Sequence, residues 1–325
     1  MTRHYQAGIS LLIVWSLFAV WHISAGAVNV PWEQVIETLS GEVTENEFII
    51  WGYRFPRMLV ASLVGASLGL SGLLVQGVVR NPLASPDVLG VTSGASLAVV
   101  LSSVLLTDIP IVWLPLIALF GGAITTAVLL WLAWHVLHQP AALALIGIAL
   151  AAVCSAGIDF LLISHPMEIN TSMIWLTGSI WGRNWSHLPM LRAWLLLLLP
   201  VAIILAYRLD LLGLGDETAQ GLGQPVFKVR IVALVVSIAL ACVAVSICGN
   251  IGFVGLVAPH VARFLTGGRH LSLIPVTMLV GATILLSADL FARILMPPIE
   301  LPAGILTAFI GAPYFIFLLT RYKRW

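Results

Sequence analysis

The sequence predicts an all-α polytopic membrane protein with about ten transmembrane helices and both termini in the cytoplasm. Of its 325 residues, 60% are apolar and only 9% are charged, whereas soluble domains carry about 25% charged residues. A chain of this composition exposes apolar surface to membrane lipid. Its formal net charge of +1 indicates no nucleic-acid partner, because such partners require a strongly basic surface.

The first apolar stretch resembles a secretion signal. Arg3 and His4 precede it, and Ala25, Gly26 and Ala27 are typical of a cleavage site. Because many more apolar runs follow, we interpret this stretch as a membrane helix that the protein keeps. A spanning helix needs about 20 apolar residues. The runs long enough are residues 8–28, 58–79, 111–134, 141–164, 188–206, 231–249, 271–296 and 301–320.

Two further runs are weaker candidates. Residues 88–107 are polar for a helix in lipid, so we expect this helix to pack inside a bundle, and residues 251–264 form a short or broken helix. Together with the longer runs they give ten segments, with no evident repeat. Residues 1–325 are therefore predicted to form one transmembrane domain.

Ten segments place both termini on one side of the membrane, and basic loops favour the cytoplasm. A cytoplasmic N-terminus puts ten basic residues inside and five outside. Residues 31–51 then lie outside and carry five glutamates without Lys or Arg. The inside set is Arg3, Arg80, Arg208, Lys228, Arg230, Arg263, Arg269, Arg321, Lys323 and Arg324; the outside set is Arg54, Arg57, Arg183, Arg192 and Arg293.

Small residues recur at helical spacing in the second segment, where Ala61, Gly65 and Gly69 lie four positions apart. Such spacing allows two helix backbones to approach closely. We interpret these residues as packing positions rather than as transport residues.

Residues 80–94 interrupt the apolar pattern between the second and third segments. Pro82 and Pro86 exclude a continuous helix, and Asp87 is a candidate cap for the next one. Two interpretations stay open. The stretch is either a structured turn or a re-entrant connection, which membranes tolerate only where protein or water satisfies the backbone. In the second case Asn81 and Pro82 line a pathway.

Few residues are candidates for chemistry inside the membrane. Cys154, Cys242 and Cys248 lack metal-ligand spacing and are interpreted as buried free thiols, and no metal site is predicted. Asp159 is a lone acid in a membrane segment, which makes it a candidate pathway residue. It also lies near the outer end of its segment, where water is close.

Several stretches, in order along nearly the whole chain, resemble the FecCD family of ABC-importer permeases. They are "YRFPRMLVASLVGASLGLSG" from Tyr53, "RNPLASPDVLGVTSGA" from Arg80, "LDLLGLGDETAQGLG" from Leu209, "GNIGFVGLVAPHVARFLTGGRH" from Gly249, "ADLFARIL" from Ala288 and "ELPAGILTAFIGAPYFIFLL" from Glu300. The stretches "WLTGSIWGRNW" and "PPIELPAG" are most similar to the FecD-type subunit of ferric citrate importers.

The resemblance implies a pathway between two permease subunits, either identical or different. It also implies two ABC ATPase subunits inside and a periplasmic or lipid-anchored binding protein outside. The chain has no G-x-x-x-x-G-K-[ST] loop, so we expect it to bind no cofactor and the partner ATPase to use the ATP. We expect no enzymatic activity.

The cytoplasmic stretch 208–230 has acids where a short helix begins and Gly-Gln-Pro where it ends. From the residues alone it is either such a helix or an ordinary solvated loop. The resemblance implies paired short helices that sit in a groove on the ATPase. The coupling residues would be Leu212, Leu214, Gly215, Asp216, Glu217, Ala219, Leu222 and Gly223.

The resemblance also implies that Arg54, Arg57 and Arg293 meet glutamates on the two lobes of the binding protein. The alternatives are snorkelling cations or an Asp289–Arg293 pair one helical turn apart. The family narrows its pathway between the fourth and fifth helices. That position corresponds to Gln139, Pro140 and Ala141, where the cobalamin permease instead has small hydroxyl residues.

The sequence therefore predicts a permease subunit in the cytoplasmic (inner) membrane that imports an Fe(III) chelate by alternating access. Ferric citrate or another siderophore is the expected cargo. A haem or cobalamin importer of the same family is one alternative. An ion-coupled secondary transporter is another, but it would normally need a mid-membrane acid, and Asp159 and Asp289 are expected to be peripheral.

Overall fold

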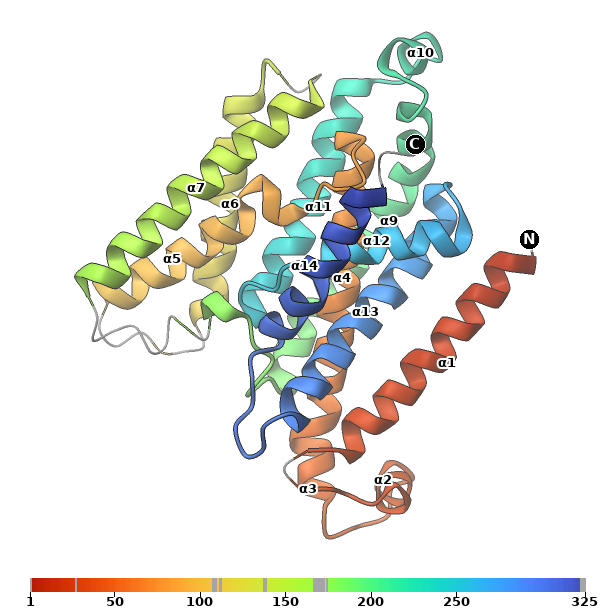
Figure 1. Ribbon diagram of the computed structural model, residues 1–325, viewed down its shortest axis with the longest axis vertical. Coiled ribbons are helices and arrows are strands. Elements are labelled where there is room, and N and C mark those ends of the chain that lie inside the picture. Colours follow the sequence, from red (N-terminus) through yellow and green to blue (C-terminus); the bar gives the residue numbers. More distant parts are fainter. Residues whose placement is uncertain are drawn as a thin grey trace.

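The computed structural model describes residues 2–26, 28–106, 110, 113–136, 139–165, 173 and 175–321, and this part of the chain is helical, without strands (Figure 1). The principal helices are α1 (Thr2–Ser24), α2 (Trp32–Leu39), α3 (Glu47–Ile49), α4 (Phe55–Val79), α5 (Val91–Leu105), α6 (Leu114–Ala133), α7 (Pro140–Ser164), α9 (Leu188–Leu212), α10 (Asp216–Gly221), α11 (Val226–Cys248), α12 (Val254–Thr266), α13 (His270–Ile294) and α14 (Ala303–Arg321). Short turns of other helical types are η1 (Ile50–Arg54), η2 (Pro86–Leu89) and η5 (Trp185–His187).

Seven helices in the described residues are long and apolar enough to cross a membrane. Three shorter apolar helices, Val91–Leu105, Val254–Thr266 and Ala303–Leu318, complete the set. Each of the predicted apolar runs coincides with one of these helices, although α1 ends earlier than expected, at Ser24, and α9 continues to Leu212. The all-helical class is confirmed, whereas ten membrane crossings stay a prediction.

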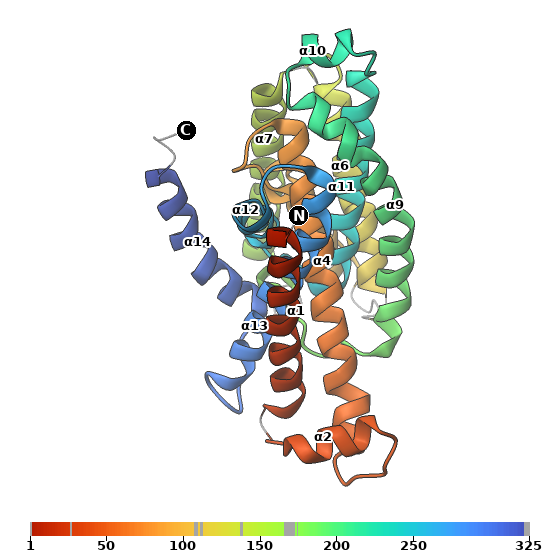
Figure 2. The ribbon, with the colours of Figure 1, turned by 90° about the vertical axis from the view of Figure 1, so that its right-hand side faces the viewer.

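Helix α4 is the central element of the bundle and packs against α11, α12 and α13. Helices α5, α6 and α7 form a group on one side, at the left of Figure 1, and α1 lies against α13 on the other side. Helix α2 and helix α10 lie at opposite ends of the molecule in both views (Figures 1 and 2). The molecule therefore has two distinct ends.

Close contact between helix backbones holds the centre together. A Cβ atom added at Gly65 would lie within 3.0 Å of the backbone of Gly281 on α13, and one at Gly72 would lie as close to Gly255 on α12. The predicted packing role of Gly65 is confirmed, because only glycine leaves room for such an approach. The three cysteines are buried free thiols, as expected.

Candidate functional site

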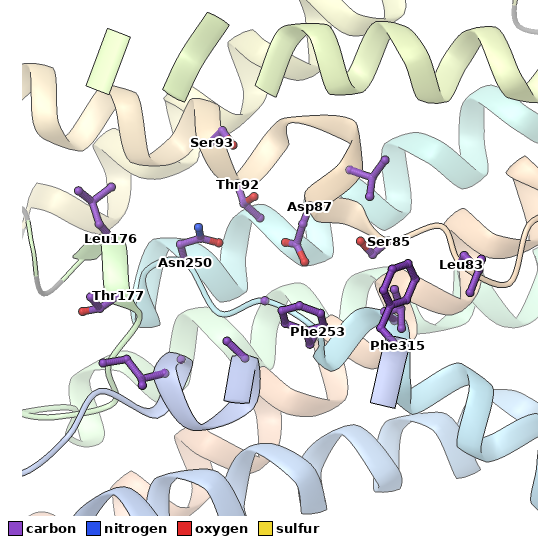
Figure 3. Close-up of a pocket in the computed structure, with 16 residues that line it drawn as sticks. Leu83, Ser85, Asp87, Thr92, Ser93, Leu176, Thr177, Asn250, Phe253 and Phe315 are labelled. Atoms are coloured by element: carbon purple, nitrogen blue, oxygen red, sulfur yellow. The ribbon is translucent and has the colours of Figure 1, made fainter. Parts of the chain in front are cut away.

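A cavity of about 590 Å³ lies where the connection between α4 and α5 meets the starts of α12 and α14 (Figure 3). Its walls come from stretches that are far apart in the sequence. They are Leu83, Ser85, Asp87, Val88, Thr92, Ser93, Leu176, Thr177, Asn250, Gly252, Phe253, Leu256, Gly304, Ile305, Ala308 and Phe315.

Local sequence explains why the connection between α4 and α5 is irregular. Helix α4 ends at Val79, its C-cap Arg80 adopts a left-handed conformation with φ 51°, and Pro82 follows. Pro86 then starts the single 3₁₀ turn η2, and Gly90, with φ 77°, leads into α5. The predicted break is confirmed, and residues of this connection line the cavity.

Asp87 has a different role from the helix cap that its position suggested. The N-cap of α5 is Gly90, which has no side chain to cap the helix. The Asp87 carboxylate instead lies beside the α11–α12 connection, where Asp87 Oδ2 is 3.9 Å from a Cβ position built on Gly252. The preceding Pro86 packs against Gly255 on α12, so the α4–α5 connection contacts the start of α12 on the opposite wall of the cavity.

The remaining walls are joined by backbone hydrogen bonds. Asn250 N–H donates to the carbonyl of Trp175 at 2.9 Å, and Gly304 N–H donates to the carbonyl of Gly178 at 2.9 Å. The Ser179 N–H donates to the carbonyl of Cys248 at 2.8 Å. These bonds hold the start of α14 and the end of α11 around one space.

Small polar groups and apolar side chains share the cavity surface. Hydroxyls come from Ser85, Ser93 and Thr177, an amide comes from Asn250, and Asp87 supplies a carboxylate (Figure 3). Among the described residues no group of three or more His, Cys, Asp or Glu could hold a metal ion. The lining therefore offers isolated polar groups on a largely apolar surface.

A buried ionic cluster lies at the end of the bundle near α2. Arg57 donates from Nε and Nη2 to the carboxylate of Asp289 at 2.8 and 2.9 Å, and from Nη1 to Glu300 at 2.7 Å. His22 Nε2 contacts the same Asp289 carboxylate at 2.8 Å. Asp289 is buried, with an exposed fraction of 1%, although it lies towards one end of the bundle rather than at its middle.

The three predicted docking arginines all belong to this cluster, and all are buried. Arg54 donates to the backbone carbonyls of Ile23, Ser24 and Val28, and Arg293 donates to the carbonyl of His22. Asp289 therefore pairs with Arg57 rather than with Arg293 one turn away. The docking role stays a prediction, and a glutamate from another protein would have to compete with these internal partners.

The opposite end of the molecule carries the predicted coupling stretch. The short helix expected there is α10, which begins at Asp216 after Gly215, a residue with φ 107°. Its Ala219 is buried, as is Leu212 at the end of α9. Between α9 and α11 the described residues form this one short helix, whereas the resemblance implied a pair.

Charge and exposure distinguish the other coupling candidates. Asp216 Oδ1 accepts a hydrogen bond from Arg230 Nη2 at 2.9 Å and forms an ion pair with Arg80. Glu217 is exposed. Leu214 and Leu222 are exposed large apolar side chains that flank α10.

The remaining candidates lie outside the cavity lining. Asn81 and Pro82 precede the lining residues directly, and Asn81 Oδ1 accepts from the Leu83 N–H at 2.9 Å. Asp159 is exposed on α7. Gln139 is the N-cap of α7, which starts at Pro140 and Ala141, and residues 137–138 of the predicted gate turn lie outside the described residues.

Sequence reasoning missed Asn250, Thr177 and the cavity role of Asp87. Asn250 lies between Gly249, with φ 72°, and Phe253, with φ 67°. Two left-handed residues so close together indicate a sharply turned backbone between α11 and α12. The glycines around Asn250 were the available signal.

Comparison with known proteins agrees with this architecture. The FecCD transport family matches residues 11–321. The Fe(3+)-citrate import system permease protein YfmE of Bacillus subtilis is 47% identical over 99% of this chain and 97% of its own length. The Fe(3+) dicitrate transport system permease protein FecD of Escherichia coli is 45% identical over 94% and 95%. A solved metal-chelate type ABC transporter in an inward-facing conformation has a TM-score of 0.87 at 33% identity, and the match covers 97% of this chain and 99% of that one. The chain therefore belongs to the FecCD transport family.

Proposed function

We propose that this chain is the transmembrane permease subunit of an ABC importer that carries an Fe(III) chelate across the cytoplasmic membrane by alternating access. The observation that carries this proposal is the 47% identity, over nearly the full length of both chains, to a permease named for Fe(3+)-citrate import. Ferric citrate is accordingly the first cargo to test, and other siderophores follow.

The cavity supports a carrier rather than a metal-binding protein. A chelator already satisfies the coordination of its iron, so the pathway needs no protein ligands for the metal. Hydroxyl and amide groups such as those of Ser93 and Asn250 provide weak hydrogen bonds to a passing polar solute. Weak contacts favour release, which transport requires.

The proposed topology has ten crossings and both termini in the cytoplasm. The α10 end would face the cytoplasm and the α2 end would face outward, since these ends are opposite (Figures 1 and 2). Cysteine placed at Glu42 should react with an impermeant reagent in intact cells, whereas cysteine at Thr218 should not. Both side chains are exposed, so the reverse result would invert the topology.

The proposed partners are a second permease subunit, two cytoplasmic ABC ATPase subunits and a substrate-binding protein outside. The exposed Leu214 and Leu222 beside α10 support the ATPase contact, because both lie beyond the ends of the apolar helices. Arg54, Arg57 and Arg293 are the residues that we propose to contact glutamates of the docked binding protein.

Reconstitution of the whole complex tests the proposed function. Vesicles that contain the permease pair, the ATPase and the loaded binding protein should take up radioactive ferric citrate only when ATP is present on the side of the membrane that the ATPase faces. Other iron chelates, haem and cobalamin serve as competing cargoes. Uptake that does not depend on ATP and that is lost when an ionophore removes the ion gradient would instead identify an ion-coupled transporter.

A further inference from the structure

We propose that the ion pair between Arg80 and Asp216 transmits movement of α10 to the cavity wall, which makes Arg80 a positioning residue for transport. The proposal rests on the proposed function, in which α10 contacts the ATPase. It concerns a residue outside the predicted coupling stretch, at the end of α4.

Asp216 is held between two arginines of unequal freedom. Arg230 lies on α11 with its side chain 2% exposed, and it donates to Asp216 Oδ1 at 2.9 Å. Arg80 pairs with the same oxygen, and its side chain is 29% exposed. Arg230 is thus buried in the helical core, whereas Arg80 belongs to the partly exposed connection between α4 and α5.

The backbone at Arg80 indicates that its side chain is needed. A helix that ends in a left-handed residue usually has glycine there, or sometimes asparagine. Arg80 adopts φ 51°, a region that non-glycine residues occupy only at a conformational cost. Glycine would fit this position better, but it could not reach Asp216.

Tight turns connect Arg80 to the cavity. The Ala84 N–H donates to the Asn81 carbonyl at 3.0 Å, and the Val88 N–H donates to the Ser85 carbonyl at 3.2 Å. The stretch between Arg80 and Asp87 is therefore a series of closed turns rather than slack chain. A displacement of Arg80 would move Ser85 and Asp87, which line the cavity (Figure 3).

The same displacement would reach the facing wall. Pro86 packs against Gly255 on α12, where an added Cβ would lie 3.0 Å from Pro86 Cδ. A movement that begins at α10 would thus pass through Arg80 and Pro86 to Gly255. Both walls of the cavity would respond to one event at the α10 end.

Partly exposed ion pairs contribute little to stability, so loss of this one should leave the fold intact. Arg80→Gly removes the side chain and suits the left-handed backbone, whereas Arg80→Lys keeps a cation. Arg269→Gln is the matched control, because Arg269 is an exposed arginine at the start of α13. The complete importer should assemble with each variant.

The measured quantity is chelate imported per ATP hydrolysed, in vesicles with the loaded binding protein. We expect Arg80→Gly to hydrolyse ATP normally and to lose about tenfold in import per ATP, within the usual range of coupling between sites. Arg80→Lys should retain most of the import, and Arg269→Gln should match the wild type. Thermal unfolding of Arg80→Gly should not occur earlier than in the wild type.

A second comparison shows whether the pair acts as a unit. In an Asp216→Asn background, Arg80→Gly should add no further loss, because interacting residues are not additive. Normal import per ATP in Arg80→Gly would overturn the inference. So would a further loss in the Asp216→Asn background as large as the loss that Arg80→Gly causes in the otherwise unchanged chain. Failure of the wild-type complex to import any chelate would instead overturn the proposed function.

Discussion

Arg57 and Asp289 join α4 to α13 through a two-point ion pair, although 232 positions separate them in the sequence. The planar guanidinium matches the two carboxylate oxygens, which is the geometry that arginine favours. His22 on α1 contacts the same carboxylate. One buried acid therefore joins three helices at the α2 end of the bundle.

Asp289→Asn should destabilise the protein strongly. Removal of one member of a buried pair costs about 3–5 kcal/mol. Arg57 would stay buried and would lose its buried counter-charge, although it keeps the partly exposed Glu300 as a partner. The free energy of unfolding of the purified permease in detergent, from denaturant titration, measures the loss.

Glu300→Gln is the matched control for that experiment. Glu300 also pairs with Arg57, but its side chain is 26% exposed, and pairs of this kind contribute about 0–1 kcal/mol. Equal losses in the two variants would show that burial of Asp289 does not decide the stability of the cluster.

Glu300→Gln should also change docking of the binding protein. If Arg57 meets a glutamate of that protein, Glu300 competes for the same guanidinium. Its neutralisation should then tighten docking several-fold, by about 1 kcal/mol, as measured by titration of the binding protein onto permease in nanodiscs. Glu42→Gln removes an exposed acid from the same end of the molecule and is the control. Unchanged affinity in Glu300→Gln would exclude Arg57 as a docking contact.

Gly72→Ala should destabilise the bundle because its new Cβ would overlap the backbone of Gly255. Overpacking of this kind costs about 1–3 kcal/mol or more, since a backbone atom cannot turn aside as a side chain does. Gly8→Ala is the control, because no atom lies within 4 Å of its Cβ position. Similar unfolding of the two variants would contradict the close packing of α4 on α12.

Gly215→Val should abolish uptake while leaving the substrate affinity of the binding protein unchanged. Gly215 has φ 107°, where a β-branched residue is strained, so α10 would shift. Gly221→Ala is the control, because Gly221 ends α10 and no atom lies within 4 Å of its Cβ position. Uptake is measured in reconstituted vesicles, and normal uptake with the ATPase bound would remove Gly215 from the coupling mechanism.

The helices could be predicted from the sequence because apolar runs of spanning length are local signals. The break after α4 was also local, since Pro82 and Pro86 exclude a helix. The partners of Asp289 were not predictable in the same way. Spacing suggested Arg293 on the same helix, whereas the actual partners come from α1 and α4, and only the packing of the bundle brings them together.

The cavity was the least predictable feature for a related reason. Asp87, Asn250 and Thr177 lie on separate stretches and share no spacing in the sequence. Asp87 stands where a helix cap is expected, but Gly90 is the N-cap of α5, and the Asp87 carboxylate lies beside Gly252 instead. At Asp87, tertiary contacts rather than local helix-capping preference determine the position of the side chain.

The backbone contacts of Gly65 with Gly281 and of Gly72 with Gly255 limit how the bundle can change shape. Each residue adds about 1.5 Å along a helix, so sliding α4 by one residue would bring a side chain against a neighbouring backbone. Interlocked helices of this kind move as a rigid body. Helices α4, α12 and α13 are therefore expected to keep their register with one another, and conformational change should involve the segments around them, such as the α4–α5 connection and the group of α5, α6 and α7.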